Sequence, residues 1–234
     1  MRDAFTRLAE IAAALPPEHW LLIGGLMVHA HAELAGVPYT RPTDDADLVV
    51  ELRAVSYAGA ADRLASLGYR LREPLDLRSP LHRYVREDEV VDLMAPEGAT
   101  VRYRLRQVLT VPGSRSALNR AIDYALPGGT RIRIPDVASA LSLKGAALHT
   151  PGATRERHAQ DAVTLLACAS PGAIELSKSM QSNVNKAIRA LDTPEAWSYA
   201  APGTRRRAVR TIQALRPDWQ APQFVFPQRF DRKP

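Results

Sequence analysis

Two aspartates near the start of this 234-residue chain have the type and spacing to do chemistry. Asp45 and Asp47 stand two residues apart at the head of an apolar run, so in a strand both carboxylates would point to the same face. Two adjacent carboxylates repel each other and are costly unless a cation lies between them. We therefore expect a hard divalent cation here, magnesium or else manganese.

A glycine pair precedes these aspartates. Gly24 and Gly25 follow an apolar run at residues 20–23 and open a mainly apolar stretch of helical length that reaches about residue 34. Glycines between a strand and a helix let the backbone approach a phosphate and leave amide N–H groups pointing at it. The pair is therefore a candidate phosphate-binding turn.

A third aspartate, Asp92, interrupts the apolar run Val-Val-Asp-Leu-Met at residues 90–94. A carboxylate in a buried strand needs a partner, because an unpaired charge there is costly. An aspartate near a strand end can meet that need by accepting local backbone hydrogen bonds. Otherwise another group has to be its partner.

Two charged residues of the C-terminal half lie in apolar helical sequence. Lys144 stands alone in residues 141–148, where a lysine either extends to solvent or reaches a triphosphate as a point charge. Asp161 heads the apolar run 162–166. It could pair with Arg157 one turn earlier, a contact worth about 0.2–0.5 kcal/mol.

The glycine pair and the aspartates together form a pattern that resembles a known superfamily. Residues 41–47 read Arg-Pro-Thr-Asp-Asp-Ala-Asp. Gly-Gly after one strand and Asp-x-Asp on the next resembles the nucleotidyltransferase superfamily that includes DNA polymerase beta. The variant Arg-x-Thr-x-Asp-x-Asp is similar to AbiEii/MenT-type toxin nucleotidyltransferases. The likeness covers residues 20 to about 215, because the helical C-terminal half also looks like that of family members.

The resemblance implies a role for each matching residue. Asp45, Asp47 and Asp92 match the metal-binding carboxylates, and Asp92 could also activate the attacking hydroxyl. Lys144 matches a catalytic lysine on the nucleotide phosphates, and Asp161 matches a distal catalytic acid. The remaining nucleotide-binding positions are Gly24, Gly25, Arg41 and Thr43.

The implied activity is transfer of an NMP from an NTP to RNA, with release of pyrophosphate. The family acceptor is the tRNA 3′ end, which would make the protein a toxin with a possible cognate antitoxin. A second hypothesis is transfer to a small hydroxylated molecule, as in antibiotic resistance. A third is a catalytically silent NTP-binding module that kept the fold.

Several elements must position these residues. Periodicity predicts a helix over 3–15, the strand–helix–strand unit at 20–50, a helix over 55–67, a strand at 69–72 and hairpins at 81–94 and 120–134. Residues 99–134 are interpreted as further strands. Helices are expected at 136–148, 155–169, 173–190, 194–200 and 204–215. The expected fold class is therefore α/β (α+β): a core with a mixed sheet over residues 1–135, a helical domain over 136–216 and an extended arm over 217–234.

Composition sets broader limits. The net charge of +6 favours an anionic partner, but arginine is spread along the chain and an arginine-rich proteome explains it equally well. Cys168 is the single cysteine, so an internal disulfide is impossible, and its apolar neighbours predict a core position. No apolar run has the roughly 20 residues of a membrane span, and the first 20 residues lack a signal-peptide core. We therefore expect a cytoplasmic protein with no membrane partner.

Overall fold

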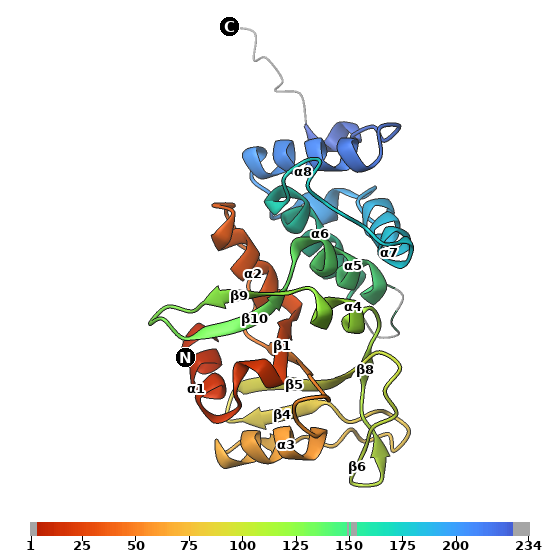
Figure 1. Ribbon diagram of the computed structural model, residues 1–234. Helices are drawn as coiled ribbons and strands as arrows, with labels where there is room; N and C mark the ends of the chain where they lie inside the picture. Colours follow the sequence, from red (N-terminus) through yellow and green to blue (C-terminus); the bar gives the residue numbers. More distant parts are fainter. Residues whose placement is uncertain (1–3, 149, 151–153, 227–234) are drawn as a thin grey trace, which may run out of the picture.

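The computed structural model describes residues 4–148, 150 and 154–226. It confirms the α/β fold class: a mixed sheet in one half of the molecule and stacked helices in the other (Figure 1). The six-stranded sheet has the order β1-β2-β5-β4-β3, with β8 added beside β5. Its strands are β1 (Trp20–Ile23), β2 (Ala46–Val50), β3 (Arg70–Leu71), β4 (Arg83–Arg86), β5 (Glu89–Pro96) and β8 (Thr110–Val111).

The sheet is mixed because β2 runs parallel to β5, whereas β1 and β4 run antiparallel to their neighbours. Strand β1 is buried along its whole length, and β2 and β5 are buried over most of theirs. Strands β2 and β5 therefore form the centre of the sheet with β1 at its edge, and none of the three has the water-exposed face that alternating sequence would produce. The parallel β2–β5 pair is the one that positions the candidate site.

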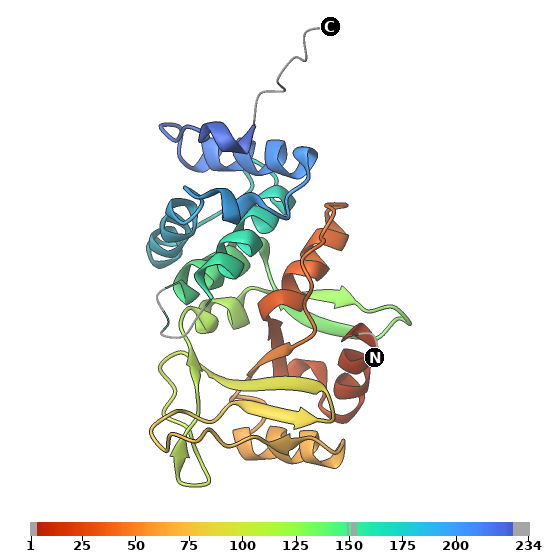
Figure 2. The same cartoon turned by 180° about the vertical axis from the view of Figure 1, so that it is seen from behind.

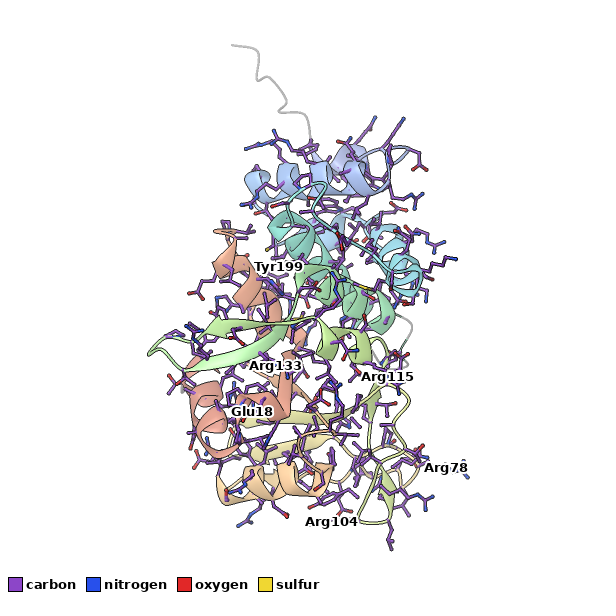
Figure 3. All side chains as sticks on the ribbon, viewed as in Figure 1. Glu18, Arg78, Arg104, Arg115, Arg133 and Tyr199 are labelled. Atoms are coloured by element: carbon purple, nitrogen blue, oxygen red, sulfur yellow. The ribbon has the colours of Figure 1, made fainter. Side chains whose placement is uncertain are left out.

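Hairpins form at both places that the sequence predicted. Strands β4 and β5 pair around a two-residue turn at Glu87 and Asp88, and β9 (Ala121–Ala125) pairs with β10 (Arg131–Pro135). A third, very short hairpin joins β6 (Arg102–Tyr103) to β7 (Arg106–Gln107). Figure 3 shows Arg133 of β10 beside Glu18, whose carbonyl accepts a hydrogen bond from Arg133 Nη1 at 3.4 Å.

The interpretation of residues 99–134 as strands was wrong over α4 (Ser114–Asn119), a short helix. Tertiary contacts explain why a helix forms at these residues. Gly113 takes a positive φ of 82°, which turns the chain. The Ser114 hydroxyl then donates to the Val111 carbonyl at 2.6 Å and accepts from the Glu97 amide at 2.9 Å. These bonds fix the first turn of α4 against the end of β5.

Most of the predicted helices are present, with shifted ends, but residues 194–200 contain only the short 3-10 helix Pro194–Trp197. Helix α5 starts where expected, because Asp136 caps it by accepting from the Ser139 amide at 2.8 Å. Helix α7 starts later than the predicted residue 173, because Ser177 is its N-cap. The helices are α1 (Ala4–Ala14), α2 (Gly24–Leu34), α3 (Tyr57–Ser66), α5 (Val137–Ala147), α6 (Arg155–Cys168), α7 (Lys178–Arg189) and α8 (Pro202–Leu215), with 3-10 turns η1 (Pro17–His19), η2 (Pro194–Trp197) and η3 (Gln223–Val225).

Helix α2 connects the two halves. It rises from the sheet and packs against α6, as both views of the ribbon show (Figures 1 and 2). Its buried residues lie on all sides rather than on one stripe, as expected for a helix enclosed by protein. The hydroxyl of Thr40, in the loop after α2, donates to the Tyr199 carbonyl at 3.3 Å. The boundary near residue 135 remains a prediction, since one continuous buried cluster runs from α1 to η3.

The described part of the C-terminal arm is anchored. Val225 is fully buried, and its carbonyl accepts from Arg205 Nη1 at 3.1 Å. The rest of the predicted arm, residues 227–234, lies outside the described residues. Cys168 is partly buried, and burial raises the pKa of its thiol to about 12. Among the described residues, no helix combines the length and apolar character needed to cross a bilayer.

Candidate active site

Two of the predicted carboxylates meet at the centre of the sheet. Asp47 on β2 and Asp92 on β5 are register partners on adjacent parallel strands, so their side chains leave the same face. Asp45 stands two residues before Asp47 and is exposed at the entrance to β2. The loop before β2 is fixed by Arg7 of α1, which donates a hydrogen bond to the Asp44 carbonyl. The sheet therefore brings Asp47 and Asp92 together, and the charge of Asp45, outside the strand, also acts on Asp47.

The glycine pair lies against this acidic group. Ile23, the last residue of β1, is the register partner of Asp47, so Gly24 begins α2 directly beside that carboxylate. Gly24 has a positive φ of 74°, and a Cβ at this position would overlap the Asp47 carboxylate. A Cβ on Gly25 would overlap the Thr43 hydroxyl and lie 2.9 Å from Arg41 Nη2. Both positions therefore require glycine because protein side chains approach them closely, while the predicted approach of a phosphate stays a prediction.

Lys144, Asp161 and Arg41 form a buried ion cluster behind the acidic group. Asp161 accepts from Lys144 Nζ at 2.7 Å and from Arg41 Nε at 2.9 Å. The three side chains are only 6%, 2% and 9% exposed. Burial by itself would lower the pKa of Arg41, but the charges of Asp161 and Tyr39 and the hydrogen bonds with them together outweigh burial and raise it. Asp161 is thus paired with these two cations and not with Arg157, the alternative that the sequence had left open.

A cavity of about 190 Å³ lies between the acidic group and Lys144. Its polar lining residues are Asp47, Lys144, His158, Thr110 and Thr150, together with the backbone at Gly24. Apolar side chains form most of the remaining wall: Ile23, Met94, Leu109, Val111, Leu143 and Ala147. The cavity can therefore hold a ligand that is charged at one end and apolar at the other. Asp161 does not line it, but it holds Lys144 at the wall and its charge opposes the fall in the pKa of His158.

The electrostatics of the site reflect crowded carboxylates. Burial raises the pKa of Asp47 to about 7, and repulsion from Asp92 and Asp45 contributes. Lys144 and Arg83 oppose that rise. Across the cavity, burial and the positive charge of Lys144 lower the pKa of His158 to about 4. His158 is therefore neutral at pH 7, while Asp47 is partly protonated unless a cation offsets the repulsion.

Sequence reasoning missed Arg83, the direct partner of Asp92. Its Nε and Nη2 atoms donate to the two Asp92 carboxylate oxygens at 2.9 and 2.8 Å. The pair follows from the β4–β5 register, in which Arg83 lies opposite Asp92. Counting outward from the turn at Glu87 and Asp88 finds this pairing, so the sequence contained the necessary information.

The acidic residues fit a divalent cation in part. Asp45 and Asp47 offer carboxylate oxygens, the ligands that magnesium prefers, and a cation would relieve the repulsion on Asp47. Both oxygens of Asp92 are already bonded to Arg83. Within the described ranges, no group of three or more His, Cys, Asp or Glu side chains has the geometry of a metal site. Arg83 therefore competes with a metal ion for Asp92, which keeps a second lone pair on each oxygen while the contact lasts.

Comparisons with known proteins assign no family. No family model matches the chain, and no curated protein matches it in sequence. One solved structure that resembles it is ANT(2″)-Ia in complex with adenylyl-2″-tobramycin. The likeness covers 89% of this chain and 97% of that chain at 15% identity, with a TM-score of 0.42. A likeness this distant assigns no activity, so the chemistry of the site has to be inferred from its own residues.

Proposed function

We propose that the chain is a metal-dependent nucleotidyltransferase that moves an NMP from an NTP to a hydroxyl acceptor. The observation that carries this proposal is the position of Asp47. It is paired with Asp92 across two parallel strands, touches the glycine start of α2, and faces Lys144 across a cavity. Carboxylates for a cation, amides for phosphate and a lysine for negative charge thus converge on one small space.

The triphosphate would lie between the start of α2 and Lys144. The first amides of α2 have no partners within the helix, and they point outward at its positive end. Lys144 is buried at the cavity wall and supplies a point charge, while Arg41 and Thr43 flank Gly25. Asp161 holds both cations in place. The apolar walls at Met94, Leu109 and Leu143 suit a nucleobase.

Asp45 and Asp47 would hold magnesium. The bound cation would neutralise charge that develops on the phosphates. Asp92 would accept the proton of the attacking hydroxyl. The hydroxyl oxygen then bonds to the α-phosphorus, the bond from that phosphorus to the bridging oxygen breaks, and pyrophosphate leaves. Catalysis on this scheme is mostly positioning plus electrostatic stabilisation of an in-line displacement.

An RNA acceptor is supported by where the positive charge lies. Residues 1–135 contain 17 basic and 17 acidic side chains, whereas residues 136–216 contain 11 basic and six acidic ones. In α8, Arg206, Arg207 and Arg210 are exposed within two helical turns. A polyanion would bind such a surface through its phosphates. We therefore propose the tRNA 3′ end as acceptor, with the protein acting as a toxin restrained by an antitoxin.

The test is transfer of label from each of the four NTPs, at millimolar magnesium, to bulk tRNA and separately to a panel of aminoglycosides and lincosamides. Wild-type protein should label the RNA, and Asp45→Ala should not. Label on a drug and none on RNA would favour the small-molecule hypothesis. A magnesium-dependent thermal shift with an NTP but no transfer to any acceptor would indicate a silent nucleotide-binding module. Transfer by Asp45→Ala at the wild-type level would refute the metal assignment.

A further inference from the structure

We propose that Arg83 is an internal counter-cation of Asp92 that competes with a divalent cation and gives way when that cation binds. The inference rests on the proposed function and adds a regulatory step to the same site. Arg83 would be a positioning residue, because it acts on Asp92 and on neither substrate. In the β4–β5 hairpin (Figure 1), Arg83 is the register partner of Asp92.

The contact between Arg83 and Asp92 fixes the carboxylate and offsets its charge. Two parallel N–H bonds, at 2.9 and 2.8 Å, use one lone pair on each carboxylate oxygen. Such bidentate pairs are among the strongest side-chain contacts and fix the carboxylate plane. The remaining lone pairs can still meet a cation, but a cation that shares Asp92 with Arg83 is repelled by the guanidinium charge. Binding of a divalent cation at Asp92 therefore favours departure of Arg83.

Arg83 lies close enough to act on the whole acidic group. Its hydrogen bonds to Asp92 raise the pKa of its guanidinium, and the charges of Asp45 and Asp47 add to this effect. One fixed positive charge thus serves three carboxylates, in the place where the proposed function requires a divalent cation. Lys144, the other cation acting on Asp47, is instead buried against Asp161.

The exposed fractions of the three basic side chains show which of them can leave its carboxylate partner. The Arg83 side chain is 39% exposed, whereas Asp92 is 10% exposed. Arg83 can therefore turn into solvent, and a cation at the site would compensate the buried Asp92 carboxylate that it leaves. Arg41 and Lys144 are 9% and 6% exposed, so leaving Asp161 would strand buried charges. Among these three cations near the site, Arg83 is the one placed to exchange with a metal ion.

The experiment measures Mn²⁺ affinity in nucleotide-free protein by electron paramagnetic resonance. Arg83→Gln should bind Mn²⁺ at least about tenfold more tightly than wild type, because an adjacent opposite charge changes an ionic equilibrium tenfold or more. Arg83→Lys keeps the charge but loses the bidentate contact, so its affinity should lie between the two. A role of Arg83 in structure alone would weaken Mn²⁺ binding or leave it unchanged.

Arg53→Gln is the matched control. Arg53 also makes a bidentate contact with a buried carboxylate, that of Glu51, at 3.0 and 2.7 Å. It is absent from the residues that line the cavity, so its replacement should leave Mn²⁺ affinity unchanged. A second readout is thermal unfolding: metal-free Arg83→Gln should melt below wild type, and Mn²⁺ should raise its melting temperature more than that of wild type.

The outcomes separate this inference from the proposed function. Equal Mn²⁺ affinity in wild type and Arg83→Gln, or weaker binding by the variant, overturns the Arg83 proposal alone. Absence of Mn²⁺ binding by wild type, Arg83→Gln and Arg83→Lys overturns both. Should Arg83→Gln fail to fold, Arg83→Lys still decides, because affinity at or below the wild-type level contradicts the exchange.

Discussion

Replacing Asp161 with asparagine should destabilise the protein far more than replacement of a surface ion-pair partner. Asp161 is 2% exposed and separates Arg41 from Lys144, with contacts of 2.9 and 2.7 Å. Asp161→Asn would leave two buried cations without their counter-charge. Removal of one partner from a buried ion pair typically costs about 3–5 kcal/mol, because the charge left behind is neither paired nor hydrated.

The assay is urea unfolding at pH 7, which gives the free energy of unfolding in water and the slope of that free energy against urea concentration. A loss of about 3–5 kcal/mol corresponds to a melting temperature lower by about 6–20 °C in a chain of this size. The slope of the free energy of unfolding against urea concentration should stay unchanged, which would show that both proteins expose the same surface area on unfolding. Adding Lys144→Met to Asp161→Asn should recover part of the loss, because one stranded charge is removed.

Arg157→Gln is the control, because Arg157 is exposed on the same helix and was the partner that helical spacing offered for Asp161. Its replacement should change stability by less than about 0.5 kcal/mol. A loss below about 1 kcal/mol for Asp161→Asn would refute the buried cluster. Equal effects of the two substitutions would restore the interpretation of Asp161 as a surface partner.

Three further predictions concern pH, backbone space and thiol reactivity. In metal-free buffer, the free energy of unfolding of Asp47→Asn should rise relative to that of wild type by about 2–4 kcal/mol between pH 4 and pH 7. The reason is that native Asp47, with a pKa of about 7, keeps a proton in this range that the unfolded chain has already lost, which costs wild type stability. Paired unfolding curves with a constant difference would contradict this. Gly24→Ala should abolish the magnesium-dependent thermal shift with NTP, because its Cβ would overlap the Asp47 carboxylate. The control is Gly128→Ala, where φ is a similar 95° but the surrounding space is open, so this variant should only lose about 1–2 kcal/mol of stability. Equal nucleotide shifts in both variants would remove the close-approach explanation. A thiol reagent at pH 8 should label native Cys168 much more slowly than urea-unfolded Cys168, since burial raises its pKa to about 12; equal rates would contradict this.

Much of the fold follows from local pattern. The alternation of apolar residues around Glu87 and Asp88 predicts the β4–β5 hairpin, and Asp136 marks the start of α5 as its N-cap. Where prediction failed, a distant contact was the cause. Helix α4 depends on the Ser114 hydroxyl meeting the amide of Glu97, 17 residues earlier in the chain. Such a bond leaves no periodicity in the sequence.

For the site, spacing alone singled out Asp45 and Asp47 and placed the glycines beside a strand end, because strand geometry has a fixed period of two and tight turns require glycine. Only the packing of α6 against the rest of the chain decided that Asp161 meets Arg41, 120 residues away, instead of Arg157 one turn earlier. Helical spacing offers Arg157 and gives no sign of Arg41. Burial favours Arg41 over Arg157, because a carboxylate enclosed by protein is stabilised by cations that are enclosed with it.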